Sequence, residues 1–268
     1  MSADVAAELG RLRDELAETR AELAALREQY ARRDRSPRFA AIYPAFEDRF
    51  RGSEADVRER LSIYLPEVRA VVRHDVAGPR VLDLGPGRGE WLMLLAEAGV
   101  VATGVDDNEA MVAELRGRGL DVVFDDAARH LGAVPDGSLD VVTAFHVVEH
   151  LDLDALLELL AQTRRVLRPG GLLVLETPNP ANLVMGACNF YLDPTHRSPV
   201  PAARLQFLAA ACGFTAIRTW ELHPKEHVDL STMRVDGIGA ADTAVLAAAL
   251  QKGLFGPQDY AVLLRTPH

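Results

Sequence analysis

Hydrophobic side chains in the first part of the chain recur at alternating intervals of four and three residues. Such an alternation is typical of the contact seam of a coiled coil, in which a helix buries its leucines against another helix. The pattern predicts a coiled-coil helix over residues 1–35, packed against a second copy of the chain or a groove of the same chain. We favour the second copy, which predicts a homo-oligomer. The seam positions are Val5, Leu9, Leu12, Leu16, Thr19, Leu23, Leu26 and Tyr30.

A different pattern follows this segment. Aromatic residues are frequent between positions 39 and 50, and Ser53 begins a capping-box-like sequence that predicts a helix running to about residue 75. We interpret residues 36–78 as a small helical cap on the domain that follows. Arg51 is a candidate ligand for an anionic group of a substrate.

From position 80 onward, short runs of valine and leucine alternate with amphipathic helical stretches. The alternation predicts a doubly wound α/β domain over residues 79–268, with a mostly parallel sheet and helices on both faces. One helix, over residues 151–168, is predicted to end in a turn at the Arg-Pro-Gly-Gly stretch before the fifth strand. Another helical stretch is expected between the last two strands. The predicted strands are residues 81–85, 101–106, 121–125, 139–145, 171–177, 214–222 and 258–265.

Composition narrows the function classes. The 268 residues are 49% hydrophobic and carry a net charge of −10, which disfavours nucleic acid as a partner because the protein's field repels phosphates. Cys188 and Cys212 have no metal-like spacing and fit a reducing cytosol. The charged N-terminal segment lacks the apolar core of a signal peptide, and no apolar run reaches the ~18 residues of a membrane span. We therefore expect a cytoplasmic protein without a membrane span.

A glycine-rich loop follows the first predicted strand, in the sequence Asp-Leu-Gly-Pro-Gly-Arg-Gly-Glu-Trp from Asp83 to Trp91. Glycines at such a position let the backbone turn tightly and approach a ligand. The G-x-G-x-G spacing departs from the G-x-G-x-x-G of dinucleotide-binding loops. The acidic Glu90 disfavours a pyrophosphate and suits a ligand that carries an amino group, to which Asp83 could also bind directly or through water.

Acidic residues also end the second and third predicted strands. Asp106 is placed to bind both hydroxyl groups of a ribose, and Asp126, which we prefer to Asp125, is placed to accept from an adenine amino group. Each acid alone is typical of a solvated strand end or a helix cap. Together with Asp83 and the glycine loop, they predict one nucleoside-type ligand at the edge of the sheet.

These motifs identify a family resemblance. Residues 80–177 resemble the class I S-adenosylmethionine-dependent methyltransferases, through VLDLGPGRGEW, GVDDN, FDDA and RVLRPGGLLVLETPNP. The resemblance implies a seven-stranded sheet with an antiparallel last strand, and S-adenosylmethionine as cofactor. The residues expected at the cofactor are Asp83, Gly85, Pro86, Gly87, Gly89, Glu90, Trp91, Asp106, Asp107, Asp126, Ala127, Phe145 and His146.

The fourth predicted strand opens into a sequence rich in histidine. His146, Glu149 and His150 stand at i, i+3 and i+4, which places them on one face if the stretch is helical. One interpretation is a divalent metal site, because two imidazoles and a carboxylate can bind zinc or a similar ion. A second is a histidine general base oriented by Glu149. A third is a histidine that caps the backbone beside a solvated glutamate. The string also matches an inverted zinc-protease motif, which we discard because it follows a methyltransferase-like strand.

A proline-rich loop over residues 189–201 follows the fifth predicted strand and combines aromatic, acidic, histidine and arginine residues. We interpret it as an acceptor-binding loop, with a rigid surface connection as the alternative. Together, FEDRFRG, HVVEHL, ETPNP and FYLDPTHRSPVP are similar to methyltransferases of bacterial surface polysaccharides, including chain-terminating enzymes of O-antigen biosynthesis.

That similarity implies an O-methyltransferase acting on a sugar hydroxyl or sugar phosphate of a saccharide or glycosylated product. The alternatives are a quinone-like or phenolic acceptor, or a catalytically silent cofactor-binding scaffold. The catalytic candidates are His150 and His196, with His146 and Glu149 beside them, and the candidates near the acceptor are Tyr191, Asp193, Arg197 and Arg51.

Overall fold

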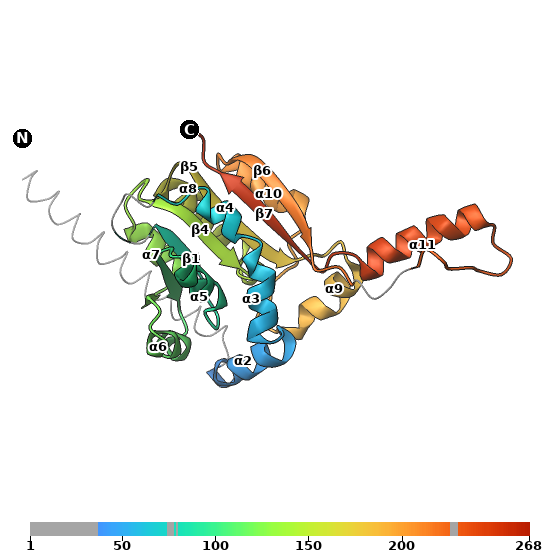
Figure 1. Cartoon of the computed structure of the whole chain (residues 1–268), viewed down its shortest axis with the longest axis horizontal. Helices are drawn as coiled ribbons and strands as arrows, with labels where there is room; N and C mark the ends of the chain where they lie inside the picture. Colours follow the sequence, from blue (N-terminus) through green and yellow to red (C-terminus); the bar gives the residue numbers. More distant parts are fainter. Residues whose placement is uncertain (1–36, 74–77, 79, 226–229) are drawn as a thin grey trace, which may run out of the picture. The chain divides into compact units, whose positions relative to one another are not determined.

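The computed structural model describes residues 37–73, 78, 80–225 and 230–268 (Figure 1). The predicted coiled-coil helix, and the homo-oligomer inferred from it, lie outside the described residues. The chain divides into two compact units, residues 1–52 and 53–268, which are described separately. In the first unit, α2 (Pro37–Phe50) carries a pair of aromatic rings, Phe46 and Phe50, with centroids 4.8 Å apart.

The second unit begins with two short helices, α3 (Glu54–Ser62) and α4 (Leu65–Arg69). The predicted capping box is present, since Ser53 Oγ accepts from the backbone N–H of Asp56 and the Asp56 carboxylate accepts from the backbone N–H of Ser53. The predicted single helix to about residue 75 is wrong, because α3 ends at Ser62 and a separate helix, α4, follows. Pro66 lies in the first turn of α4, where the backbone N–H that proline lacks would have no partner within the helix.

Seven strands form one sheet in the order β3-β2-β1-β4-β5-β7-β6 (Figure 1). The first five strands by sequence are parallel, and β7 runs antiparallel to both β5 and β6. The predicted doubly wound, mostly parallel seven-stranded sheet is therefore confirmed. The strands are β1 (Val81–Leu84), β2 (Ala102–Asp106), β3 (Val122–Phe124), β4 (Leu139–Phe145), β5 (Leu167–Pro178), β6 (Thr215–Leu222) and β7 (Asp259–Arg265).

The start of β5 differs from the sequence prediction. Leu167 already pairs with Leu139 of β4, and the next pair joins Leu172 to Val141, so residues 168–171 form a bulge within the strand. Gly170 adopts a φ of +71°, a conformation that is also common in turns. The Pro-Gly-Gly sequence therefore predicted a turn where the structure has a bulge. The preceding helix accordingly ends at residue 166 rather than 168.

Helices cover both faces of the sheet. Side chains of α7, α8 and α10 pack on one face, while those of α3, α4 and α5 pack on the other. The short helix α9 contacts α11, which lies between β6 and β7 in sequence (Figure 1). The remaining elements are α5 (Glu90–Glu97), α6 (Glu109–Gly117), α7 (Ala127–Ala133), η1 (Val148–His150), α8 (Leu153–Val166), α9 (Leu183–Ala187), η2 (Asn189–Leu192), α10 (Ala202–Ala211) and α11 (Ala240–Phe255).

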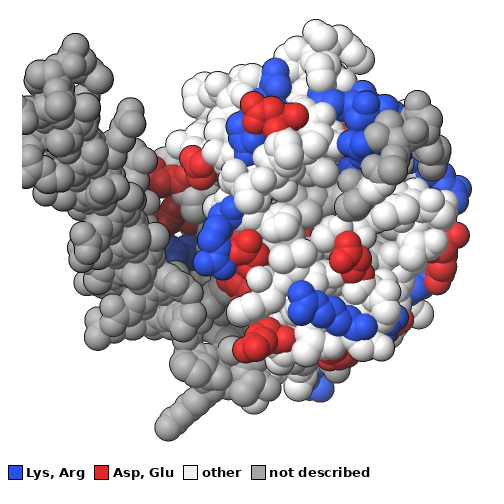
Figure 2. Space-filling view, turned by 90° about the vertical axis from the view of Figure 1, so that its left-hand side faces the viewer, with Lys and Arg blue, Asp and Glu red and all other residues white. Residues whose placement is uncertain are grey.

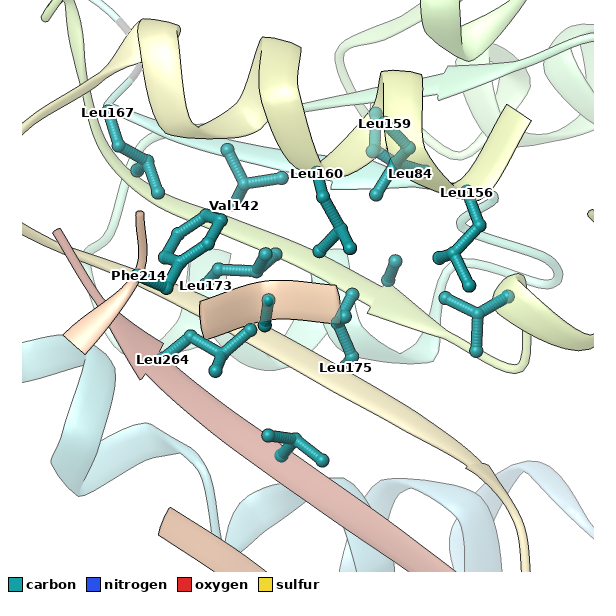
Figure 3. Close-up of a cluster of buried hydrophobic side chains, with 14 of the residues drawn as sticks. Leu84, Val142, Leu156, Leu159, Leu160, Leu167, Leu173, Leu175, Phe214 and Leu264 are labelled. Carbon is teal, nitrogen blue, oxygen red and sulfur yellow. The ribbon is translucent and has the colours of Figure 1, made fainter. Parts of the chain in front are cut away.

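The core follows the alternation of side chains along the central strands. In β5, Leu173 and Leu175 point to the face covered by α8 and α10, whereas Leu172 and Val174 point to the opposite face. Figure 3 shows the hydrophobic cluster on the face covered by α7, α8 and α10, in which the leucines of α8 lie over those of β5. Each large apolar side chain buried in this way stabilises the fold by about 1.5–3 kcal/mol. The packed sheet gives a rigid support for the loops at the strand ends.

Two surface features bear on partners. No helix within the described ranges is long and apolar enough to cross a bilayer. Figure 2 shows lysine and arginine side chains mixed with aspartate and glutamate on the face that it displays.

Candidate functional site

Polar side chains gather where the parallel strands end. The strand order reverses between β1 and β4, the kind of switch point at which open α/β sheets bind ligands. Asp83 lies near the end of β1, Asp106 ends β2, His146 follows β4 and Glu176 lies near the end of β5. The predicted cofactor and acceptor residues in the second unit therefore come from neighbouring strands at one edge of the sheet.

The glycine loop after β1 requires its glycines. Gly85, Gly87 and Gly89 have φ values of +66°, +54° and +84°, a region that side chains with a Cβ rarely adopt. A Cβ at Gly85 would lie 2.9 Å from Val147 Cγ2, and one at Gly89 would lie 2.6 Å from Leu115 Cδ2. The loop is thus held close to the segment after β4 and leads directly into α5, as a ligand-binding glycine loop does.

The three predicted acids have defined partners. Asp83, which is 1% exposed, accepts a hydrogen bond of 2.6 Å from Thr143 Oγ1. Asp106 Oδ1 accepts from the backbone N–H of Asn108 at 2.8 Å. Asp126 is the N-cap of α7, and its side chain accepts from the backbone N–H of Arg129. The helix-cap role considered for such acids therefore applies to Asp126, and the nucleoside contacts of all three stay predictions.

Three other predicted cofactor residues, Glu90, Trp91 and Phe145, are buried among protein side chains. The carboxylate of Glu90 is buried and accepts from Arg88 Nε at 2.7 Å, and its contact with a ligand amino group stays a prediction. Trp91 packs edge-on against Tyr64 and against Phe145, with ring centroids 6.4 Å and 5.5 Å away. The rings of Trp91 and Phe145 therefore belong to the core beneath the loop. Pro86, Gly87, Asp107 and Ala127 lie in or directly after the loops that follow β1, β2 and β3.

His146 lies between two buried carboxylates. It has a φ of +57°, and its Nδ1 is 3.2 Å from Glu149 Oε1 while its Nε2 is 3.4 Å from Glu176 Oε1. Burial alone would lower the pKa of His146, but the two carboxylates outweigh it and raise the pKa to about 10. This pKa favours a protonated His146 near neutral pH, which is not the form of a general base; the catalytic role of His146 stays a prediction.

Glu149 is fully buried and ionised. Burial would raise its pKa, but the close contact with His146 and the charges of the nearby imidazoles lower the pKa to about 2. Its Oε2 accepts from Thr177 Oγ1 at 2.9 Å. Its Oε1 receives no hydrogen bond of acceptable geometry from the described residues, although His146 lies at ion-pair distance. The interpretation of Glu149 as a solvated residue is wrong.

His150 and His196 form a pair. Their ring centroids are 4.8 Å apart, His150 Nδ1 lies 3.0 Å from Thr195 Oγ1, and His196 Nδ1 lies 2.7 Å from the carbonyl oxygen of Phe190. His196 Nε2 is 3.9 Å from Glu149 Oε1. Burial is the main cause that lowers the pKa of His150, so this imidazole is neutral near neutral pH. The proline-rich loop after β5 thus brings His196 to the residues that follow β4.

This arrangement differs from the predicted single helical face. Because His146 has a left-handed conformation and η1 begins only at Val148, the ring of His146 points to Glu176 while that of His150 points to the proline-rich loop. The structure therefore brings Glu149 and His150 together with His196, and these three offer ligand atoms within 4.8 Å of one another.

The predicted acceptor residues vary in exposure. Tyr191 is 63% exposed, whereas Asp193 is buried and its Oδ1 accepts from Thr195 Oγ1 at 2.5 Å. The Arg197 side chain is exposed and lies 3.4 Å from Asp152. Arg51 belongs to the first unit, where it donates to Glu47 at 2.8 Å. Contact of these residues with an acceptor stays a prediction.

Some residues of the site escaped sequence analysis. Glu176 partners His146, and Tyr64 donates a hydrogen bond to its other carboxylate oxygen. An acid in the otherwise apolar strand GLLVLET was a signal that could have revealed Glu176. Tyr64 and Thr195 carried no such signal, because Tyr64 is 112 residues from Glu176 and Thr195 is 45 residues from His150.

The sheet order, the antiparallel β7 and the glycine loop at the switch point define a class I methyltransferase fold. A family model of the methyltransferase domain matches residues 15–219, so the chain belongs to this family. A solved S-adenosylmethionine-dependent methyltransferase from Archaeoglobus fulgidus is 36% identical, with a TM-score of 0.74 over 84% of this chain and 99% of that one. S-adenosylmethionine is accordingly the cofactor of this domain.

Curated relatives give the same class. A probable S-adenosylmethionine-dependent methyltransferase of Mycolicibacterium smegmatis is 36% identical over 143 residues, which cover 53% of this chain and 54% of that protein. A ubiquinone biosynthesis O-methyltransferase of Xanthomonas oryzae is 37% identical over 113 residues, which cover 40% of this chain and 46% of that protein. The chain thus spans about half the length of the curated relatives it matches.

Proposed function

We propose that the protein is an O-methyltransferase that methylates a sugar hydroxyl or sugar phosphate of a saccharide or glycosylated product. The observation that carries the proposal is the pair His150–His196 beside the ionised Glu149, at the sheet edge that also holds the glycine loop. A hydroxyl is a poor nucleophile while it keeps its proton, and such a pair can activate it. A neutral amine nitrogen needs no proton removal before it attacks, so the pair favours a hydroxyl oxygen over such a nitrogen as the acceptor atom.

The reaction makes clear demands on the site. Bound S-adenosylmethionine supplies an electrophilic methyl group on a sulfonium sulfur. The acceptor oxygen forms a bond to the methyl carbon as the carbon–sulfur bond breaks, and the sulfur keeps the electron pair. The hydroxyl proton leaves to a base or to solvent. The protein must therefore align the two reactants, exclude water, and either accept the hydroxyl proton or lower the pKa of the hydroxyl.

Each residue of the cluster has a role in this scheme. His150 is neutral near neutral pH and so has a lone pair available, either for the hydroxyl proton or for a metal ion that polarises the hydroxyl. The protonated His146 keeps Glu149 and Glu176 ionised and does not take part in proton removal. On the cofactor side, the glycine loop receives the amino-acid part, and Asp106 and Asp126 are assigned to the nucleoside.

The acceptor class rests on the loop after β5. Its aromatic, acidic and basic side chains in a proline-stiffened backbone are the groups with which proteins bind sugars or sugar phosphates. A second candidate is a quinone-like phenol, which is favoured by the similarity to the ubiquinone biosynthesis O-methyltransferase of Xanthomonas oryzae. The negative net charge and mixed surface charges favour a small acceptor over nucleic acid (Figure 2).

Transfer of a labelled methyl group to two acceptor panels, one of saccharides and sugar phosphates and one of phenols and quinols, tests the proposal. We expect incorporation into the first panel, and a loss of about 100-fold in His150→Ala and in His196→Ala with S-adenosylhomocysteine binding retained. His268→Ala, at the opposite edge of the sheet beside Gly170, is the control and should keep full activity. Product in the phenol panel alone would support the second candidate, and cofactor binding without any transfer would support a silent scaffold.

A further inference from the structure

We propose that Glu149, His150 and His196 bind a divalent transition-metal ion, with Zn²⁺ and Mn²⁺ as the ions to test. The three residues come from η1 and from the loop after β5, and their ligand atoms lie within 4.8 Å of one another. Two atoms bound to one ion at about 2.0–2.2 Å lie roughly 3–4 Å apart. Glu149 Oε1 and His196 Nε2, at 3.9 Å, are already in this range.

In both imidazoles Nδ1 has a hydrogen-bond partner, which leaves Nε2 as the nitrogen that can bind a metal. His196 Nδ1 lies 2.7 Å from the carbonyl oxygen of Phe190, which can only accept. In the neutral imidazole Nδ1 therefore carries the proton and Nε2 the lone pair. This lone pair faces Glu149. A backbone carbonyl that fixes the tautomer of an imidazole is a typical outer-sphere partner of a metal-bound histidine.

The same reasoning applies to His150. Thr195 Oγ1 donates its proton to Asp193 Oδ1, so it accepts from His150 Nδ1 at 3.0 Å. His150 Nε2 is then also unprotonated. The hydrogen bonds that connect Asp193, Thr195 and His150 resemble those of metal sites, where a carboxylate accepts from the second nitrogen of a metal-binding imidazole.

The third ligand is a buried carboxylate oxygen that lacks a hydrogen bond. Glu149 Oε1 has no donor of acceptable geometry within the described residues, although the carboxylate is ionised and fully buried. The charge is paired with His146, but an oxygen without a well-aligned donor still loses part of its stabilisation in a buried site. An ion bound by Oε1, by His196 Nε2 and by an imidazole nitrogen of His150 would stabilise this oxygen directly.

A second cluster in the structure is a poorer candidate. His146, Glu176 and Asp259 also offer ligand atoms close together, but both nitrogens of His146 face carboxylates and carry protons. An imidazole must lose a proton before it binds a metal, which weakens binding at this cluster. The same argument disfavours the set His146, Glu149 and His150 that the sequence spacing suggested.

The donor set favours particular ions. Two imidazole nitrogens with one carboxylate suit zinc, manganese or iron, whereas magnesium and calcium prefer oxygen donors. Three protein ligands leave positions open for a further oxygen. If the proposed function is correct, that oxygen is the acceptor hydroxyl, whose pKa the ion lowers. The two imidazoles would then act as ligands rather than as bases.

Calorimetric titration of the chelator-treated full chain with ZnCl₂ and, separately, with MnCl₂ tests the site. We expect one ion per chain for at least one metal, and binding weakened about 100-fold in His150→Ala and in His196→Ala. Thr195→Val keeps all three ligands but removes the partner of His150 Nδ1, and should weaken binding about 10-fold. His268→Ala is the matched control and should bind as the unaltered protein does.

Far-ultraviolet circular dichroism reports whether each sample is folded, and binding of S-adenosylhomocysteine to the same samples reports whether the cofactor site is intact. If this ligand binds but neither ion does, or if the ions bind equally to the His150→Ala and His196→Ala variants, the metal site is refuted and the proposed function stands with histidine as base. If neither ion nor S-adenosylhomocysteine binds to the folded chain, both proposals fail.

Discussion

Tyr64, in the short connection between α3 and α4, donates a hydrogen bond to the buried carboxylate of Glu176 in β5. Glu176 in turn lies 3.4 Å from His146, which pairs with Glu149. A helical segment near the start of the second unit is thereby connected to the candidate site through buried charges. The low polarity around these groups strengthens each contact.

Replacement of Tyr64 by phenylalanine tests how much this contact stabilises the fold. The variant keeps the aromatic packing on Trp220, whose ring centroid is 5.6 Å away, but leaves a buried carboxylate without its hydroxyl donor. We expect the free energy of unfolding to fall by about 1.5–3 kcal/mol in urea denaturation. Tyr191→Phe, at a 63% exposed side chain, is the control and should change it by less than about 0.5 kcal/mol. Equal effects of the two changes would contradict the prediction.

Asp140 makes stability depend on acidic pH. Burial raises the pKa of Asp140, but hydrogen bonds and charge from Arg73 and Arg168 outweigh it and lower the pKa below 3.8. The folded state thus favours the ionised form, and this stabilisation is present above the unfolded pKa and lost as the pH falls through the folded value. Asp140→Asn should therefore cost about 3 kcal/mol at pH 7 and progressively less as the pH falls below 3.8.

Urea denaturation over a pH series measures this difference. Asp136→Asn is the matched control, because the Asp136 side chain is 80% exposed and also pairs with an arginine, Arg165. Exposed pairs contribute less than about 1 kcal/mol. A constant difference between the unaltered protein and Asp140→Asn at all pH values would show that the charge of Asp140 is not the cause.

Most strands were predictable from sequence because they are short runs rich in valine and leucine between turn residues, although β6 (Thr215–Leu222) contains no such run. The start of β5 was not, since its bulge around Gly170 has the composition of a turn. In the site, local spacing grouped His146 with Glu149 and His150, whereas the fold replaces His146 by His196. Two facts beyond local spacing cause this exchange: the positive φ of His146 and its pairing with Glu176, thirty residues further along the chain.

Gly85 should tolerate no side chain. Alanine there must adopt a φ near +66° and place its Cβ 2.9 Å from Val147 Cγ2. Gly119→Ala is the control for backbone strain alone, because its φ is +81° but no atom lies within 4 Å of the added Cβ. We expect Gly119→Ala to destabilise the fold by about 1–2 kcal/mol. Gly85→Ala should destabilise it further and also weaken binding of S-adenosylhomocysteine, as calorimetry would measure; equal affinity in the two variants would contradict a role of this loop at the cofactor.

Asp106 ends β2 beside the glycine loop, and its predicted role is to bind the two ribose hydroxyls of the cofactor. Asp106→Ala removes hydrogen bonds to a charged group worth about 1.5–3 kcal/mol, so S-adenosylhomocysteine should bind roughly 10- to 150-fold more weakly in calorimetry. The carboxylate also accepts from the backbone N–H of Asn108, so some loss of thermal stability is expected as well. Asp121→Ala separates the two effects. Asp121 lies just before β3, at the opposite edge of the sheet, and its carboxylate accepts a hydrogen bond from Thr103. Asp121→Ala should lower stability without changing affinity, and equal affinity losses in both variants would mean that Asp106 acts through the fold rather than on the ribose.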